Sequence, residues 1–148
     1  MATGITAVIS PQTHRRIDQL TFPGLLAAAA WMARWDRRAA AVTLATAAIE
    51  GTAYLTTHYP PAVLPLMSFR THNRVAAAHG AFVVALGLTL PGLTRRGRAA
   101  LCTLGTMPIT LAALSDTREP PLGHPTGVEG PGPRGRATSP ASYSRQAR

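Results

Sequence analysis

The stretch that decides the fold is Arg38-Ala-Ala-Ala-Val-Thr-Leu-Ala-Thr-Ala-Ala-Ile-Glu-Gly-Thr-Ala-Tyr-Leu-Thr-Thr57, which returns sixty positions later as Arg98 to Thr117. Nine of the twenty aligned positions are identical. An earlier segment repeats at a shift of 58, where Thr13-His14-Arg15-Arg16-Ile17 corresponds to Thr71-His72-Asn73-Arg74-Val75. Self-similarity of this kind indicates repeated supersecondary units. The chain is therefore predicted to hold two copies of one helical hairpin, each with a basic lead-in and an Arg-rich turn.

Composition narrows the class of protein. The 148 residues carry a net charge of +9, and all 15 basic residues are arginines. They lie in short clusters between apolar runs, so they favour an anionic membrane surface over nucleic acid as the partner. The single cysteine, Cys102, excludes a disulfide or a cysteine-based metal site within one chain.

Periodicity separates a soluble bundle from a membrane bundle. A helix on the surface of a soluble protein needs a polar stripe, and neither Ala39–Ala53 nor Val75–Leu93 has one. Helices that are apolar all round belong in lipid or in a much larger core than this chain can build. Small residues recur three to four positions apart, as in Ala76 and Gly80, which allows close helix packing in lipid.

We therefore predict an all-α fold, a four-helix transmembrane bundle made of two tandem helical hairpins. A flexible N-terminus (1–12) precedes a membrane domain (13–117), and a disordered Pro-, Gly- and Arg-rich tail (118–148) follows it. The expected membrane spans are about 17–33, 39–55, 75–93 and 99–114.

A resemblance to a known family rests on short motifs in their order along the chain. They are Ile17-Asp18, Gly24, the helix that carries Glu50, Leu55-Thr-Thr-His-Tyr59, Leu64-Pro65-Leu66-Met67, His72 and Gly80. In this order the chain resembles the small bacterial four-helix membrane proteins built from two hairpins, some of which carry a Ser-Pro-Trp (SPW) repeat. The chain lacks the Ser-Pro-Trp motif itself, and the resemblance implies a four-span membrane protein without supplying a reaction.

One carboxylate lies deep in a predicted span. Glu50 is seven residues before Thr57 and His79 is six after Asn73, so both lie roughly 9–10 Å from the same surface and could meet. Tyr54, four residues after Glu50, shares its helix face. An intramembrane carboxylate is a functional candidate, and a structural role and a role in proton, ion or ligand handling both stay open for Glu50.

The remaining polar candidates lie at the helix entries. His14 and His72 are equivalent in the repeat and are predicted to be interfacial or capping residues. Asp18, which has Ala76 as its counterpart, is expected on the same side as the histidines. Glu50, His58, His72 and His79 have suitable types for metal ligands, but no close-spaced pair lies on one helix. We therefore expect neither a metal nor a cofactor.

No Gly-rich phosphate loop, nucleophile elbow or close pair of carboxylates is present, so we expect no enzymatic activity. The first hypothesis is a structural or accessory component of the bacterial inner membrane, with the termini weakly favoured on the cytoplasmic side. Lipid is the expected partner, a homo-oligomer is allowed, and no nucleic acid is expected. The second hypothesis is a small transporter or proton-coupled carrier that uses Glu50 and His79. A third, a soluble nucleic-acid-binding protein, predicts extraction by alkaline carbonate.

Overall fold

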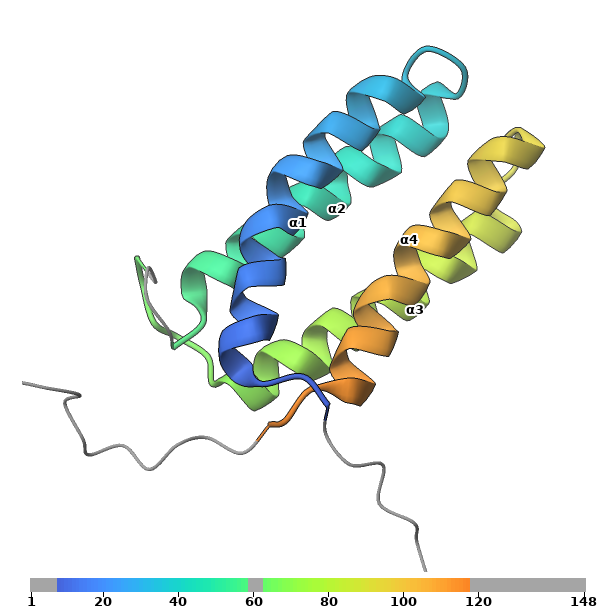
Figure 1. Ribbon diagram of the computed structural model, residues 1–148. Helices are drawn as coiled ribbons and strands as arrows, with labels where there is room; N and C mark the ends of the chain where they lie inside the picture. The colour runs from blue at the N-terminus through green and yellow to red at the C-terminus, as the bar shows by residue number, and fades with distance from the viewer. Residues whose placement is uncertain (1–7, 59–62, 118–148) are drawn as a thin grey trace, which may run out of the picture.

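A computed structural model describes residues 8–58 and 63–117, and its regular secondary structure there is entirely helical (Figure 1). The helices are α1 (Pro11–Met32), α2 (Arg37–Thr56), α3 (Phe69–Thr89) and α4 (Arg95–Leu114). α1 pairs with α2 and α3 pairs with α4, so the two predicted hairpins and the all-α class are confirmed. The predicted tail, and residues 1–7 of the predicted flexible N-terminus, lie outside the described residues.

α1 and α3 begin six residues before the predicted segments 17–33 and 75–93. The reason is a matched pair of N-caps, in which the Ser10 and Ser68 hydroxyls each accept the backbone N–H three residues later at 3.2 Å. Serine at this position satisfies one of the free amides of the first turn. The additional turns bring His14 and His72 into helices, each four residues after its capping serine.

The turn between α3 and α4 also begins earlier than the sequence predicted. α3 ends at Thr89 rather than near Leu93, because Pro91 cannot continue a helix and Gly92 adopts a φ of 74°. Thr94 then caps α4, accepting the backbone N–H of Gly97 at 2.9 Å. The arginines that the sequence assigned to this turn therefore lie in the first turn of α4.

The structural repeat is 58 residues long throughout. α1 and α3 begin at positions 11 and 69, α2 and α4 begin at 37 and 95, and the matching C-caps are Thr57 and Ser115. The sixty-residue alignment of the second helices is therefore two residues out of register with the structural repeat. Glu50 is consequently equivalent to Pro108, not to Thr110.

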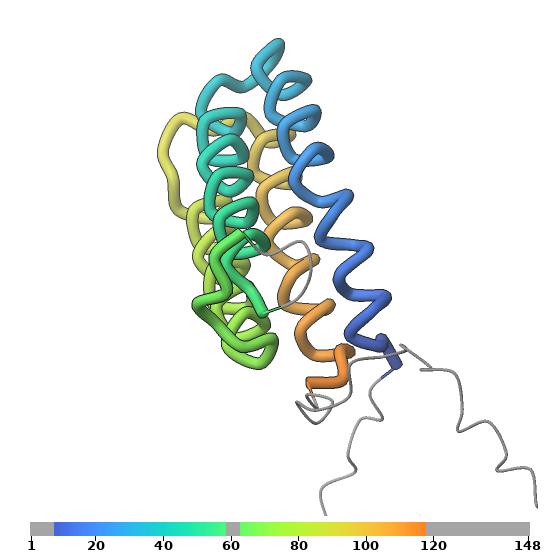
Figure 2. Tube along the Cα trace, turned by 90° about the vertical axis from the view of Figure 1, so that its left-hand side faces the viewer, coloured from blue at the N-terminus to red at the C-terminus, as the bar shows by residue number. Residues whose placement is uncertain are grey.

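The two ends of the bundle differ. Both tight turns lie at one end, and the start of α1, the end of α4 and the link between the hairpins lie at the other (Figures 1 and 2). At that second end, Ile9 bridges to Ser115 and Thr57 bridges to Met67. The gathering of the ends agrees with the prediction for two antiparallel hairpins.

Packing within the second hairpin is close. A Cβ on Gly80 would meet the backbone oxygen of Gly105 and, at 2.7 Å, the ring of Pro108. The apolar core is small and consists of side chains near the tight turns: Met32, Ala39, Ala40, Val83, Leu93 and Leu101.

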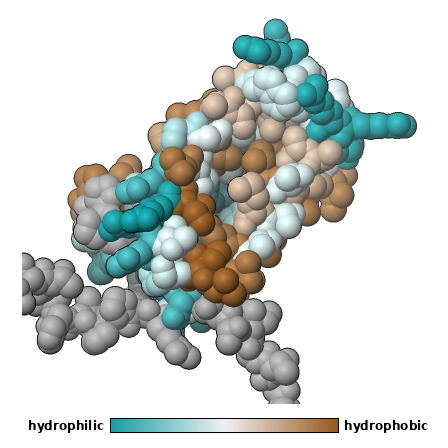
Figure 3. Space-filling model, in the orientation of Figure 1, coloured by the Kyte–Doolittle hydropathy of each residue, from teal (hydrophilic) through white to brown (hydrophobic). Residues whose placement is uncertain are grey.

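Large apolar side chains remain exposed on all four helices. Leu20 on α1, Leu44 on α2, Leu88 on α3 and Met107 on α4 expose 73, 54, 65 and 56% of their surface. Figure 3 shows apolar surface along the bundle and hydrophilic residues gathered toward its ends. Among the described helices, α4 alone meets a hydropathy and length criterion for a membrane span, with a mean hydropathy of 1.2.

Candidate functional site

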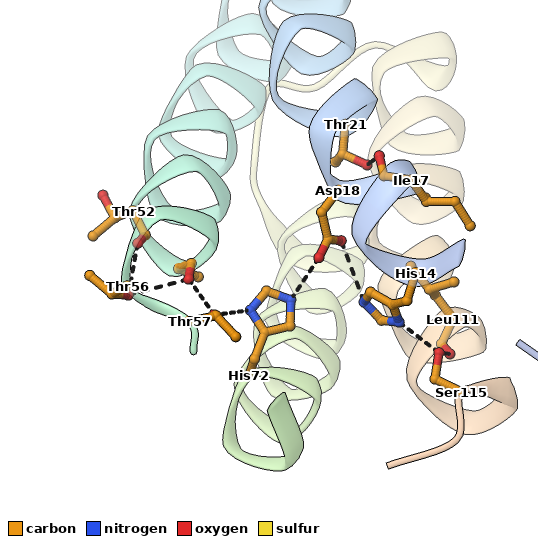
Figure 4. A network of polar contacts seen from close by, with 11 residues as sticks. His14, Ile17, Asp18, Thr21, Thr52, Thr56, Thr57, His72, Leu111 and Ser115 are labelled. Atoms are coloured by element: carbon orange, nitrogen blue, oxygen red, sulfur yellow. Dashed lines mark hydrogen bonds and ion pairs between the residues drawn. The ribbon is translucent and has the colours of Figure 1, made fainter. Parts of the chain in front are cut away.

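Two histidines and one aspartate converge at the end of the bundle that carries the termini (Figure 4). His14 Nε2 lies 3.4 Å from one carboxylate oxygen of Asp18, and His72 Nε2 lies 3.4 Å from the other. His14 and Asp18 are one turn apart on α1, whereas His72 comes from α3. Both histidine side chains are almost fully buried, and that of Asp18 is 11% exposed. We call these three residues the His–Asp–His cluster.

Each histidine is tied to the other hairpin through a hydroxyl. His14 Nδ1 lies 2.6 Å from Ser115 Oγ after α4, and His72 Nδ1 lies 3.0 Å from Thr57 Oγ1 after α2. The two contacts are related by the 58-residue repeat, so the hairpins exchange equivalent bonds across an approximate two-fold axis. The single carboxylate of Asp18 breaks that symmetry, because its counterpart is Ala76.

Phe69 packs against both imidazole rings. Its ring meets His14 edge-on at a centroid distance of 4.9 Å and stacks with His72 at 6.3 Å. Phe69 is itself buried. An apolar wall of this kind limits the access of solvent to the cluster and restricts the rotation of both rings.

A groove of about 910 Å³ opens beside the cluster. Side chains from α1 and α4 supply most of its wall, and the lining is largely apolar. His14, Asp18, His72, Glu50 and the thiol of Cys102 are the ionisable groups in that wall. Glu50 is half-buried in the same wall.

The sequence-based candidates divide into two groups. Asp18, His72 and Glu50 share the wall of the groove, whereas His79 and Tyr54 do not line it. His79 Nε2 is buried without a hydrogen-bond partner among the described residues. Glu50 therefore shares a groove with the His–Asp–His cluster, and its predicted pairing with His79 stays a prediction.

His58, the other histidine of a type suited to metal binding, is exposed on the link, where its Nε2 lies 2.8 Å from the carbonyl oxygen of Pro65. His14 is the member of the cluster that the sequence did not nominate as a site residue. The signal that could have found it is the repeat, because an approximate two-fold axis brings equivalent residues of the two copies face to face.

Asp36 joins the two hairpins at the opposite end of the bundle. Its Oδ1 accepts the backbone N–H groups of Arg38 and Ala39 at 3.1 and 3.0 Å, capping α2. Its Oδ2 accepts the N–H and the hydroxyl of Thr94, both at 2.8 Å. Burial would by itself raise the pKa of Asp36, but these hydrogen bonds to its charged form lower it below the usual value.

Several arginines at the turn end are engaged within the protein. The guanidinium of Arg96 lies 4.6 Å from the ring centroids of both Trp31 and Trp35. Arg98 donates to the carbonyl oxygens of Gly87, Leu88 and Leu90 at the end of α3, where a positive charge also complements the helix dipole. These arginines therefore connect helices, beyond the topology and lipid-contact roles expected from the sequence.

Comparison with known proteins yields no relative: no family model, curated protein or solved structure matches the chain. The resemblance to the SPW-repeat proteins therefore stays a prediction, and the function has to be argued from the geometry of this molecule.

Proposed function

We propose that the chain is an integral membrane protein, a four-helix bundle that serves as a structural or accessory component of a bacterial inner membrane. The observation that carries the proposal is the distribution of polarity. Large apolar side chains are exposed on every helix, while His14, His72, Thr43 and Thr57 are buried between them. A protein folded in water has the opposite arrangement as a rule.

Lipid accounts for this surface better than a single protein partner does. A partner would cover one face, but Leu20, Leu44, Leu88 and Met107 belong to four different helices. α4 passes the hydropathy criterion with 17% of its apolar window buried, whereas the core helix of a soluble protein is mostly buried. A continuous solvent such as the bilayer interior can cover all these faces at once.

The lengths of the helices and the residues at their ends also support a membrane-spanning bundle. The four helices have 20 to 22 residues, which at 1.5 Å per residue gives roughly 30–33 Å, the thickness of a hydrocarbon core. Their arginines lie near the helix ends, and Trp31 and Trp35 lie beside the tight turns, where an aromatic belt is expected. We place the termini on the cytoplasmic side.

Fractionation of bacteria that express the full chain tests the proposal. The protein should stay in the membrane pellet after alkaline carbonate and should enter solution only with detergent. A monodisperse species in detergent-free buffer would refute membrane integration, and it would revive the soluble nucleic-acid-binding alternative.

A second candidate function is that of a small carrier, and the groove favours it. The groove brings Glu50 and the His–Asp–His cluster together beside a largely apolar wall, and a carboxylate at this depth costs roughly 2.5–3.5 kcal/mol to insert. The predicted pairing of Glu50 with His79 remains part of this proposal, and the cluster adds further ionisable groups to the same groove as Glu50. Replacing Glu50 by Gln should abolish proton or solute flux in proteoliposomes and leave the bundle assembled. Loss of the folded bundle would favour the structural role instead.

A further inference from the structure

We propose that His14, Asp18 and His72 bind one divalent transition-metal ion of the Zn²⁺ type, through the two imidazole Nε2 atoms and the carboxylate between them. The ligand atoms of the three residues lie within 4.8 Å of one another. The site is separate from the role of the bundle as a membrane component, so the two proposals can fail independently.

The hydroxyl partners decide which nitrogen of each imidazole carries the proton. Ser115 Oγ donates its proton to the carbonyl oxygen of Leu111 at 2.7 Å, and Thr57 Oγ1 donates its proton to that of Ala53 at 2.6 Å. A hydroxyl has a single proton, so each can only accept from the histidine beside it. Nδ1 is therefore the donor in both rings.

It follows that in each neutral imidazole the lone pair is on Nε2, and both lone pairs face the Asp18 carboxylate (Figure 4). These two lone pairs and the carboxylate are the donors that a metal ion would use, and fixing of the tautomer through the other ring nitrogen is the usual arrangement for a metal-bound histidine.

The nitrogen-to-oxygen distances in the cluster are longer than those of strong hydrogen bonds. A hydrogen bond between an imidazolium and a carboxylate is about 2.7–2.9 Å long, but both nitrogen-to-oxygen separations are 3.4 Å. His14 Nε2, in a side chain that is 1% exposed, has no hydrogen-bond partner within the part of the chain that the structure describes. Two ligand atoms each about 2.0–2.1 Å from a tetrahedral Zn²⁺ are roughly 3.3–3.4 Å apart. Each imidazole nitrogen lies at that distance from one carboxylate oxygen, and the three ligand atoms, all within 4.8 Å of one another, would close around the ion when it binds.

The donor types select the class of ion. Two imidazole nitrogens and one carboxylate oxygen suit Zn²⁺ and neighbouring first-row metals, whereas Mg²⁺ and Ca²⁺ prefer oxygen alone. Three protein ligands leave one position open in a tetrahedral site. All three ligands also line the groove, so an exogenous ligand could occupy that position, and Glu50 lies in the same wall.

Metal binding should be measured on the full chain in detergent, first stripped with a chelator and then titrated with Zn²⁺ by calorimetry. One equivalent should bind, and Co²⁺ should give the visible absorption of a site with nitrogen ligands. Asp18→Asn and His72→Gln should each weaken Zn²⁺ binding by more than the roughly 10- to 100-fold that loss of an outer-shell partner costs. His58→Gln changes an exposed histidine and should bind as the unaltered protein does.

A variant that changes only a residue orienting one ligand tests the proposal even if a ligand variant fails to fold. Ser115→Ala leaves all three ligands in place and removes the hydroxyl that orients His14, so Zn²⁺ affinity should fall by about 10- to 100-fold while the helical circular dichroism stays unchanged. Failure of the unaltered protein to bind Zn²⁺ or Co²⁺ would overturn the proposal. Binding by folded Asp18→Asn and His72→Gln at unaltered affinity would overturn it equally, because the ion would then lie elsewhere.

Discussion

The carboxylate of Asp36 accepts two hydrogen bonds of 2.8 Å from Thr94, 58 residues away in sequence, one from the backbone N–H and one from the side-chain hydroxyl. Because the other oxygen of Asp36 caps α2, one buried side chain satisfies amides at the start of α2 and at the turn before α4. The relationship locks the two tight turns together, at the end of the bundle opposite the His–Asp–His cluster.

Removing this carboxylate should destabilise the bundle. Asp36→Ala deprives α2 of its N-cap and leaves the Thr94 amide without its acceptor, so we expect a loss of roughly 2–4 kcal/mol in the free energy of unfolding. Thr94→Val removes one of the two bonds to Asp36 and also the N-cap of α4, so it should cost about 1–2 kcal/mol. Unfolding in mixed micelles, followed by circular dichroism, measures both effects. Arg37→Ala, an exposed neighbour, is the control, and an equal loss in that variant would contradict the assignment.

The same carboxylate should make stability depend on pH only in acid. The folded-state pKa of Asp36 is lowered, so its stabilisation is complete above the unfolded pKa of about 3.9 and is lost as the pH falls through the folded value. The difference in unfolding free energy between the unaltered protein and Asp36→Asn should therefore be constant from about pH 5 to 7 and shrink below about pH 4. A difference that changed between pH 5 and 7 would point to another group.

Gly80 should tolerate no side chain, because α3 and α4 touch there through backbone. Gly80→Ala places a Cβ against the Gly105 oxygen and the Pro108 ring, and we expect overpacking to cost about 1–3 kcal/mol. Gly24→Ala is the matched control, since a Cβ at that position meets nothing within 4 Å. That control should be neutral or stabilising by up to about 1 kcal/mol through helix propensity. Equal destabilisation of both variants would show that helix packing is not the cause.

Membrane topology follows from the arrangement of the ends. In a Cys102→Ser background, single cysteines at Ala33 and Thr89 lie near the two tight turns, and one at Leu64 lies on the link; all three positions are exposed and none is an arginine. A membrane-impermeant maleimide should label Ala33→Cys and Thr89→Cys from the same side and Leu64→Cys from the other. Labelling of the two turn cysteines from opposite sides would exclude the four-span arrangement.

The fold class could be predicted from the sequence, because four apolar segments, two short turns and a proline-rich link are local properties of the chain. It was less informative about the site. Counting residues gave similar depths for Glu50 and His79, but depth along a helix does not determine which way a side chain faces. Direction around the axis is set by packing, and packing turns Glu50 toward the groove that holds the His–Asp–His cluster, whereas His79 is not part of that groove.

What the sequence by itself determined is the pair of hairpins, because capping serines, prolines and runs of small apolar residues act over a few positions. What only the tertiary structure decided is the pairing between copies: the 58-residue register, the bond from Asp36 to Thr94, and the meeting of His14 with His72 across Asp18. Asp36 and Thr94 are 58 positions apart, and Asp18 and His72 are 54 positions apart. These contacts form because the hairpins dock around an approximate two-fold axis, and that docking is set by the packing of all four helices together.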